Sequence, residues 1–364
     1  MGRHRKTRRE LKKQRKIIVI SLIAFLFIMV GGYAAFQTNL NITAKGNINP
    51  RNSLYVSSLG SDETGRGTQA RPYKTLAKAY NSAAAEATIY VMDNLTIDET
   101  VIFDQNKKIT LTSETNEINS LLRGKEDEML LKISSGETTF TNITIDGQNK
   151  EANYALLRGE NKAIINLNMG TTIQNNIDNI DAGGGVSIHY STMTINGAKI
   201  INNKALGGGG GGIITNYATL TINSGEISNN YSVGSGGGIF FGGSGDLLTM
   251  NGGLITKNET TQGGGISLAS TNMVMNGGEI SENIANYSGG GGIALGRFAY
   301  NQSVPSSFIF KKGEIKNNTA TPYGGGIYLT NTISTYTNEG GNVFDNTPDD
   351  VYKANSWIKS QDVI

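Results

Sequence analysis

Few residues in this chain of 364 could supply chemistry at a compact site. The sequence has no cysteine, and His4 and His189 are its only histidines. Thiol nucleophiles, disulfide frameworks, zinc fingers and multi-histidine metal sites are therefore excluded. Any chemistry must come from carboxylates, assisted by lysine, arginine, tyrosine or His189.

Aspartates are sparse in residues 161–346, where they are Asp178, Asp181, Asp246 and Asp345. Paired carboxylates do acid–base work only when a few ångströms apart, and calcium needs six to eight oxygen ligands. Asp178 and Asp181 are close in sequence, but they fall on a predicted turn. We therefore expect them to be solvated rather than catalytic.

Three glutamates share one position of a sequence repeat described below. They are Glu226, Glu279 and Glu314, and other copies place Lys199 or Leu254 there. Such variation indicates a solvated outward position rather than a row of metal ligands. His189 stands alone in the chain beyond residue 4, so no Ser-His-Asp triad can be argued and a structural or solvent-facing role is expected. The sequence thus predicts no catalytic residue, no metal site and no cofactor, although an enzyme stays open.

One insertion could form a binding loop. The repeat step lengthens from 27 to 34 residues across Leu295–Ser307, LGRFAYNQSVPSS. Insertions in a solenoid become loops on its flank, and such loops often bind ligands. Arg297, Phe298 and Tyr300 are suited to stacking on a sugar or a peptide, so they are the predicted ligand-binding residues. The alternative is a tolerated insertion without a role.

These residues must be positioned by an internal repeat, which is the strongest signal in the sequence. A Gly-Gly-Gly-aliphatic element ends at Val186, Ile213, Ile239, Ile266, Ile293 and Ile327. An aliphatic-x-x-Asn element runs in phase with it, from Ile173/Asn176 to Val343/Asn346. Short alternating strands such as MTING and LTMNGG lie between the two elements. Because two elements keep their register over seven copies, each copy is a structural unit.

The repeat predicts an all-β fold, a right-handed parallel β-helix. Each unit has about three short strands and no helix, so it can bury its apolar face only against the next copy. Matched isoleucines would form ladders inside, and matched asparagines would form a ladder of amide hydrogen bonds. The glycine triplet would mark a corner that needs positive φ or leaves no room for Cβ. A short helix around residues 74–83 would cap the N-terminal end.

The N-terminus carries a membrane signal. Residues 1–16 hold nine Lys and Arg against one acid, and residues 17–36 are uncharged, IIVISLIAFLFIMVGGYAAF. A helix of 20 apolar residues spans a bilayer core, and the basic flank keeps its N-terminus cytoplasmic. We expect a retained signal anchor. Cleavage as a signal peptide near Gly32-Tyr33-Ala34 is the alternative, and the protein would then be secreted.

Two resemblances accompany these patterns. The repeats over about 170–346 resemble the GGA-[ILV] and FxxN repeats of the polymorphic outer-membrane protein family, with GGG-[IV] and [IV]-x-x-N in their place. The segment from Tyr55 to Leu76 resembles the N-terminal signature of pectate-lyase-like bacterial β-helix proteins. Both imply a β-helical surface protein. The second also implies that polysaccharide lyases, hydrolases and epimerases are relatives.

The sequence therefore predicts a single-pass membrane protein with an extracytoplasmic β-helix. The expected parts are a cytoplasmic tail (1–16), a transmembrane anchor (17–36), a spacer (37–53), an N-terminal strand and capping helix (54–87), the β-helix (88–350) and a C-terminal tail (351–364). We expect a cell-surface adhesin or display module that binds glycans or proteins. The body beyond the tail is mildly acidic, so nucleic acid is not an expected partner. The alternative is a polysaccharide-active enzyme.

Overall fold

The computed structural model describes residues 51–354, apart from 116, 127, 181–182, 297–304 and 331–332, together with residue 13. The chain divides into two units, residues 1–50 and 51–364. Apart from residue 13, the predicted tail and anchor lie outside the described residues, and of the predicted spacer only residues 51–53 are described, in the first strand. In the part of the chain that is described, no helix has the length and apolar character needed to cross a bilayer.

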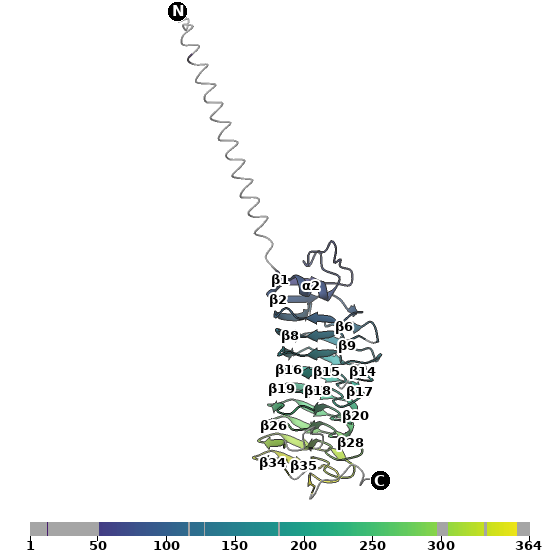
Figure 1. Ribbon diagram of the computed structural model, residues 1–364, viewed down its shortest axis with the longest axis vertical. Helices are drawn as coiled ribbons and strands as arrows, with labels where there is room; N and C mark the ends of the chain where they lie inside the picture. Colours follow the sequence, from purple (N-terminus) through teal and green to yellow (C-terminus); the bar gives the residue numbers. More distant parts are fainter. Residues whose placement is uncertain are drawn as a thin grey trace, which may run out of the picture. The chain divides into compact units, whose positions relative to one another are not determined.

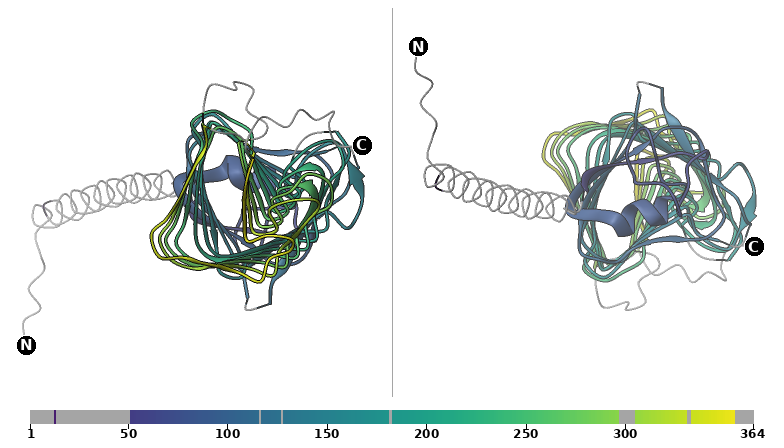
Figure 2. Two further views of the ribbon diagram at one scale, coloured as in Figure 1. Left: turned by 90° about the horizontal axis from the view of Figure 1, so that it is seen from below. Right: turned by 90° about the horizontal axis from the view of Figure 1, so that it is seen from above.

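The second unit is a parallel β-helix of about nine turns, built from three sheets (Figure 1). Successive coils superimpose when viewed along the column (Figure 2). We call the 19-stranded sheet A, the 7-stranded sheet B and the 10-stranded sheet C. A typical coil adds two strands to sheet A, then one to sheet B and one to sheet C. This confirms the predicted all-β parallel solenoid with almost no helix.

Sheet A has two rows of strands. The first row is β1 (Arg51–Val56), β2 (Ala83–Val91), β5 (Lys108–Ser113), β8 (Glu137–Thr141), β12 (Ile164–Asn168), β16 (Thr192–Ile201), β19 (Thr219–Ser228), β22 (Leu247–Met250), β26 (Asn272–Met275), β30 (Ser307–Phe310) and β34 (Thr335–Asn338). The long strands β16 and β19 continue into the second row. Its other members are β3 (Leu95–Ile97), β6 (Asn119–Arg123), β9 (Ile143–Asp146), β13 (Thr172–Gln174), β23 (Leu254–Thr256), β27 (Glu279–Ser281), β31 (Glu314–Lys316) and β35 (Asn342–Phe344).

Sheets B and C complete each coil. Sheet B is β10 (Glu151–Ala152), β14 (Ile177–Asp178), β17 (Lys204–Ala205), β20 (Tyr231–Ser235), β24 (Glu259–Gln262), β28 (Ile284–Ala285) and β32 (Thr319–Ala320). Sheet C is β4 (Val101–Phe103), β7 (Leu131–Ile133), β11 (Leu157–Gly159), β15 (Val186–His189), β18 (Ile213–Asn216), β21 (Ile239–Phe241), β25 (Ile266–Leu268), β29 (Ile293–Leu295), β33 (Ile327–Leu329) and β36 (Val351–Lys353).

Aliphatic columns form the core, as the repeat predicts. Ile173, Ile200 and Ile227 pair in register and are at most 1% exposed. The residue after each glycine triplet forms a second buried column in sheet C, from Val186 to Ile327. Burying an aliphatic side chain stabilises the folded chain by about 1.5–3 kcal/mol, and only neighbouring coils can provide that burial here.

The glycine triplets satisfy both predicted requirements, at different glycines. The first glycine has positive φ, for example +75° at Gly210. The second has no room for a side chain, because a Cβ on Gly211 would lie 2.4 Å from the carbonyl oxygen of Gly237 in the next coil. The sequence Gly-Gly-Gly is therefore imposed by backbone conformation at one position and by coil-to-coil contact at the next.

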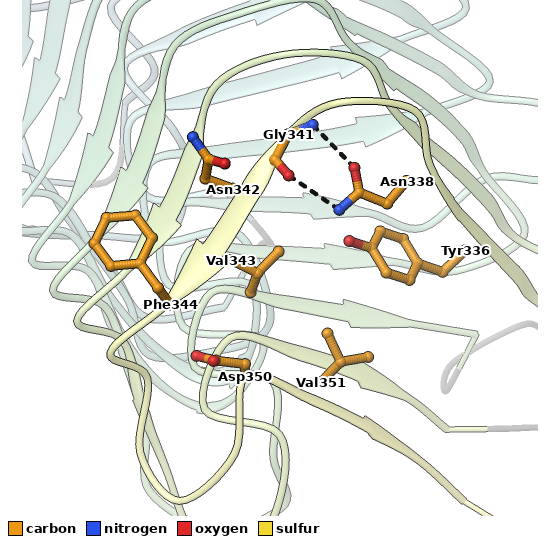
Figure 3. Close-up of a pocket in the computed structure, with 8 residues that line it drawn as sticks. All are labelled: Tyr336, Asn338, Gly341, Asn342, Val343, Phe344, Asp350 and Val351. Carbon is orange, nitrogen blue, oxygen red and sulfur yellow. Dashed lines mark hydrogen bonds between the residues drawn. The ribbon is translucent and has the colours of Figure 1, made fainter.

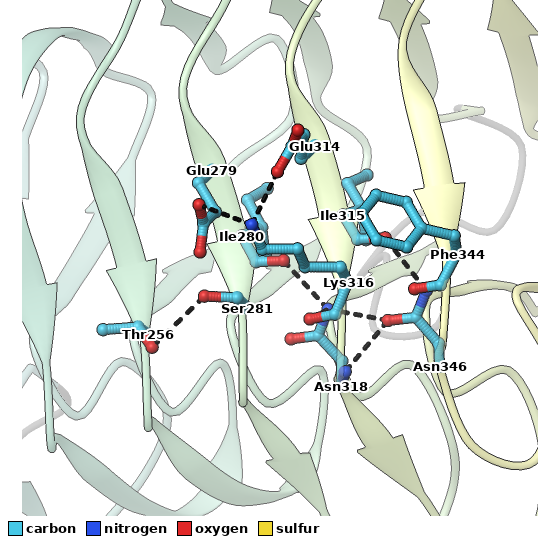
Figure 4. Close-up of polar contacts among 10 residues, drawn as sticks. All are labelled: Thr256, Glu279, Ile280, Ser281, Glu314, Ile315, Lys316, Asn318, Phe344 and Asn346. Atoms are coloured by element: carbon cyan, nitrogen blue, oxygen red, sulfur yellow. Dashed lines mark hydrogen bonds and ion pairs between the residues drawn. The ribbon is translucent and has the colours of Figure 1, made fainter.

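The predicted asparagine ladder is present and buried (Figure 4). Each amide donates from Nδ2 to Oδ1 of the next asparagine, at 3.1 Å from Asn203 to Asn230 and 3.0 Å from Asn230 to Asn258. The same oxygen also accepts the backbone N–H of the preceding asparagine. The ladder continues through Asn283, Asn318 and Asn346, all at most 8% exposed.

A charged group lies at each end of this ladder. At its start, fully buried Arg123 donates from Nη2 to Asn176 Oδ1 at 3.0 Å. At its end, Asn346 donates from Nδ2 to Asp350 Oδ1 at 2.9 Å. Burial lowers the pKa of Arg123 to about 10, against the opposing charge of Asp178. Asn176 Nδ2 donates to the Tyr154 and Gly184 carbonyls, and only its backbone N–H reaches Asn203 Oδ1. The amide–amide bonds therefore run from Asn203 to Asn346 and end on a carboxylate that only accepts.

A short helix closes the N-terminal end, as predicted. Helix α2 (Leu76–Ser82) begins at Thr75, whose side chain accepts a hydrogen bond from the Lys78 N–H. Its buried face includes Leu76 and Tyr80, and the Tyr80 ring stacks on Phe103 with centroids 4.3 Å apart. The helix contacts β1, β2 and β4, so it covers the apolar interior of the first coil.

Candidate functional site

The predicted binding residues Arg297, Phe298 and Tyr300 lie outside the described residues. The strands that flank the insertion are β29 and β30, so its ends leave from the corner between sheets C and A. Three coils earlier, the same corner carries an aromatic pair described below. The binding role of these three residues therefore stays a prediction, and the structure shows only at which corner the insertion begins and ends.

The repeated glutamates face outward and half-exposed, as predicted, but they form ion pairs (Figure 4). Glu226 lies 3.5 Å from Lys199, and Lys316 Nζ lies 3.0 Å from Glu279 Oε2 and 2.6 Å from Glu314 Oε2. Retaining glycosidases place two carboxylates about 5 Å apart, and one of them must be protonated. Hydrogen bonds from Ser281 and Lys316 lower the pKa of Glu279, so this row resembles an ion-pair network more than an acid–nucleophile pair.

Two aspartates are buried, contrary to the predicted solvation of Asp178. Asp178 is 0% exposed, and its Oδ1 accepts the Ile180 N–H. Asp246 accepts from Thr215 Oγ1 and from the N–H groups of Ala218 and Gly243. Burial raises the pKa of Asp246 despite these hydrogen bonds. Both carboxylates therefore accept hydrogen bonds from groups near them in the coil. Asp181, which was also predicted to be solvated, lies outside the described residues.

Cavities occur at the two ends of the column. One of about 490 Å³ opens beneath the last coil and is lined by residues that include Tyr336, Val343 and Phe344 (Figure 3). Its one carboxylate, Asp350, already terminates the asparagine ladder. Another of about 480 Å³ lies beside α2 over the first coil. Both are lined in part by side chains of the core or packed against it, Val343 at the last coil and Leu76 and Leu95 at the first.

The outer face of sheet C carries a compact polar cluster. On three neighbouring strands, alternate side chains lie on the outer side: Lys132 and Ser134 at β7, Arg158 and Glu160 at β11, and Ser187 and His189 at β15, where Ser187 is fully buried. Lys132 pairs in register with Arg158, and Arg158 with Ser187. Parallel strands about 4.8 Å apart thus bring together six polar residues from residues 132–189. We call these six residues the C-face cluster.

Hydrogen bonds and charge organise this cluster around Glu160. Lys132 Nζ lies 2.9 Å from Glu160 Oε1, Ser134 Oγ donates to the same oxygen at 3.1 Å, and Arg158 Nε lies 3.4 Å from Oε2. His189 Nε2 and Ser187 Oγ are 2.8 Å apart. Burial acts to raise the pKa of Glu160, but Lys132, Ser134 and Arg158 outweigh it and lower the pKa. Glu160 is therefore a held, charged acceptor.

The lowered pKa of Glu160 predicts how stability depends on pH. A carboxylate with a depressed folded pKa stabilises the protein above its unfolded pKa, and that contribution is lost as pH falls through the folded pKa. Glu160→Gln should therefore lower Tm at about pH 7 and make little difference at about pH 3. Thermal unfolding of both proteins at the two pH values checks this. An equal Tm deficit at both would show that Glu160 acts through packing rather than charge.

An exposed pair of tyrosines adjoins the cluster. Tyr190 directly follows His189, and Tyr217 occupies the same place one coil later. Their rings are parallel within 4°, with centroids 4.9 Å apart, and they are 59% and 51% exposed. The Tyr190 carbonyl accepts the Lys162 N–H at 2.7 Å, which ties this corner to the turn that follows Glu160. Aromatic faces and polar groups therefore meet at one corner.

Sequence patterns missed most of this site. The sequence interpretation treats His189 as isolated, whereas its ring bonds Ser187, which pairs in register with Arg158. A signal existed in the repeated polar-x-polar spacing of K-I-S, R-G-E and S-I-H. From the sequence alone these three segments could not be aligned with one another, because the glycine triplets that set the register begin only at Gly183.

Comparisons with known proteins identify no family for this chain. No protein-family model and no curated protein matches the sequence. Among solved structures, it is similar to the crystal structure of the GH136 lacto-N-biosidase from Eubacterium ramulus. The similarity has a TM-score of 0.38 at 10% identity and covers 84% of this chain and 68% of that chain. The predicted likeness to the pectate-lyase-like and polymorphic outer-membrane proteins stays a prediction.

Proposed function

We propose that this protein binds carbohydrate at the C-face cluster and the adjoining tyrosine pair, as a β-helical recognition module. The observation that carries the proposal is the stacked, exposed pair Tyr190 and Tyr217 beside a half-buried set of charged and hydroxyl side chains. Sugars present an apolar C–H face and a rim of hydroxyls, and this corner offers a matching aromatic face and polar groups.

In this proposal, the sugar lies against one face of Tyr190. Tyr217 covers the face of Tyr190 that looks toward the C-terminal coils. The other face of Tyr190 looks toward the preceding coil, where the turn holds Asn161 and Lys162 and has no aromatic ring. A sugar stacked on that face would lie beside the coil of Glu160. Its hydroxyls could then donate to Glu160 and accept from Lys132.

The held carboxylate suits recognition of hydroxyl groups. Lys132 and Ser134 fix Glu160 before any ligand arrives, so little rotamer entropy is lost on binding. Lys132 and Glu160 remain 33% and 20% exposed, so both can be reached from solvent. The opposing charges largely cancel, which favours neutral sugars over strongly anionic ones.

Binding should depend on one ring and one carboxylate. Tyr190→Asn keeps a residue that tolerates positive φ, and Glu160→Gln keeps the side-chain shape. Each is expected to weaken binding of neutral oligosaccharides about tenfold or more, as expected when a stacking face or a charged hydrogen bond is lost. Isothermal titration of full-length protein against an oligosaccharide panel measures this.

The matched control is Tyr287→Asn, which removes a tyrosine of 51% exposure from the turn after β28, away from sheet C. This variant should bind as the parent does. If all three variants bind alike, the tyrosine pair and the cluster are not the carbohydrate site, and the proposal fails.

A second candidate function is cleavage of a glycan at this corner, which is the polysaccharide-active alternative. The observation that favours it is the combination of a charged Glu160 with His189 and Ser187 in one cluster, since charged carboxylates and imidazoles serve as bases. Glycoside hydrolysis also needs a second acid group. Among the described residues the cluster holds one carboxylate. New reducing ends in the same oligosaccharide incubations, lost in Glu160→Gln, would establish cleavage.

We also propose a location for this module at the cell membrane. Residues 17–36 would anchor it in a cell membrane with residues 1–16 in the cytoplasm, and the β-helix would be displayed outside as an adhesin-like rod. The partners would be cell-surface or host glycans or glycosylated proteins. Protease protection of the N-terminal tail in sealed vesicles, with an accessible β-helix, tests this orientation.

A further inference from the structure

We propose that a second surface, separate from the C-face cluster, docks neutral polysaccharide along the column. It is the outer side of the first row of sheet A from β12 to β34. We call it the Thr/Asn face. Its two columns are Ile164, Thr192, Thr219, Leu247, Asn272, Ser307 and Thr335, and Asn166, Thr194, Thr221, Thr249, Val274, Ile309 and Thr337.

Strand pairing makes this face regular. The side chains of each column are in register from coil to coil, and strands in a sheet lie about 4.8 Å apart. Seven strands therefore give a face about 30 Å long, on which hydroxyl groups alternate irregularly with aliphatic side chains and two amides. Because every strand of the face except β34 is bonded to a neighbour on both sides, the face is rigid before a partner binds.

Absence of charge distinguishes the face from the rest of the column. Neither of its two columns contains a charged residue. The outer side of the second row of sheet A carries Lys199, Glu226, Glu279, Glu314 and Lys316, and sheet B carries Lys204 and Glu259. The first row is itself charged before β12, at Glu86, Lys108 and Glu137. The general preference of β-strands for threonine does not explain why charged side chains are absent from these columns from β12 onward.

A second asparagine ladder borders the face and orders its edge. Asn196 donates to Asn168, Asn223 to Asn196, Asn251 to Asn223 and Asn276 to Asn251, at 2.7–3.2 Å. Each amide has two N–H donors and an oxygen with two lone pairs, and the ladder uses one of each. The remaining donors and acceptors point to solvent from half-buried or exposed side chains with fixed orientation.

These features select the partner. An uncharged face offers no ionic attraction to nucleic acid, anionic lipid or uronate polymers. A repeating array of hydroxyls, amides and small apolar groups matches a polymer that repeats neutral hydroxyl-bearing units. Each contact is weak, and many in a row act together. The occupant we infer is a neutral polysaccharide lying along the column.

Sedimentation with insoluble polysaccharide tests this inference. Full-length protein is mixed with crystalline cellulose, with chitin and with a calcium pectate gel, and the bound fraction is measured over a range of polymer concentrations. We expect binding to a neutral polymer and none to pectate. Thr221→Lys, at the centre of the face, should weaken binding at least tenfold because it places an uncompensated cation against a neutral partner.

Thr319→Lys on sheet B is the matched control, since the same column of sheet B already accepts Lys204. It should bind as the parent does, and circular dichroism should show both variants folded. The inference is overturned if no neutral polymer binds, or if the two lysine variants behave alike. Loss of polymer binding only in Tyr190→Asn would instead support the proposed C-face site and overturn this one.

Discussion

Asn258→Ala is expected to cost about 3–5 kcal/mol of folding free energy, a large part of the roughly 5–15 kcal/mol that holds most domains together. Asn258 Oδ1 accepts both the backbone N–H and Nδ2 of Asn230, and its Nδ2 donates to the Ile227 carbonyl and Asn283 Oδ1. Alanine would remove all four of these hydrogen bonds at a position that is 0% exposed, although Asn230 Nδ2 keeps its bond to the Ile200 carbonyl and Asn283 Oδ1 keeps its bond from the backbone N–H of residue 258. The denaturation midpoint in urea measures the effect.

Asn223→Ala provides the control within the same repeat. Asn223 belongs to the exposed ladder and bonds Asn196 and Asn251 at the surface, so water can replace the lost partners. We expect a cost below about 1 kcal/mol. Equal shifts in midpoint for the two variants would show that burial of the ladder does not set its contribution. Midpoints are compared because repeat arrays can unfold in stages.

Gly264→Ala is expected to destabilise the column by about 2–4 kcal/mol. A Cβ at Gly264 would lie 2.4 Å from the Gly291 carbonyl oxygen and 2.7 Å from the backbone N and O of Ile284. All three contacts are to backbone, so relief requires two coils to move apart. That movement would stretch the hydrogen bonds from the Gly264 and Gly265 N–H groups to Gly290 and Gly291.

The comparison for this variant is Gly245→Ala. A Cβ there would meet no atom within 4 Å, although φ is +86°. This variant should lose only the free energy needed to hold alanine at positive φ, about 1–2 kcal/mol. Thermal unfolding of both variants separates contact from conformation. If Gly245→Ala lowers the unfolding temperature more than Gly264→Ala does, backbone conformation rather than coil spacing explains why the Gly-Gly-Gly triplet is repeated along this chain.

Local sequence was sufficient for the solenoid because each unit depends on its neighbours alone. The period set the coils, the aliphatic residues set the inward columns, and the aliphatic-x-x-Asn element set the buried ladder. The helix at Leu76–Ser82 followed from apolar spacing and the break after Pro72. In a quasi-one-dimensional fold, residues one period apart are in contact, so sequence separation translates directly into distance.

The residues of the candidate site could not be predicted from the repeat period. Asp178 is on a turn in sequence and fully buried in the structure, where its charge opposes the effect of burial on the pKa of Arg123. Lys132 and Arg158 precede the regular triplets, so only strand pairing shows that they adjoin Ser187. The sequence by itself determined a parallel β-helix and its ladders, since those arise from repetition. Tertiary structure alone decided which polar side chains share a face, because that depends on the register of irregular coils.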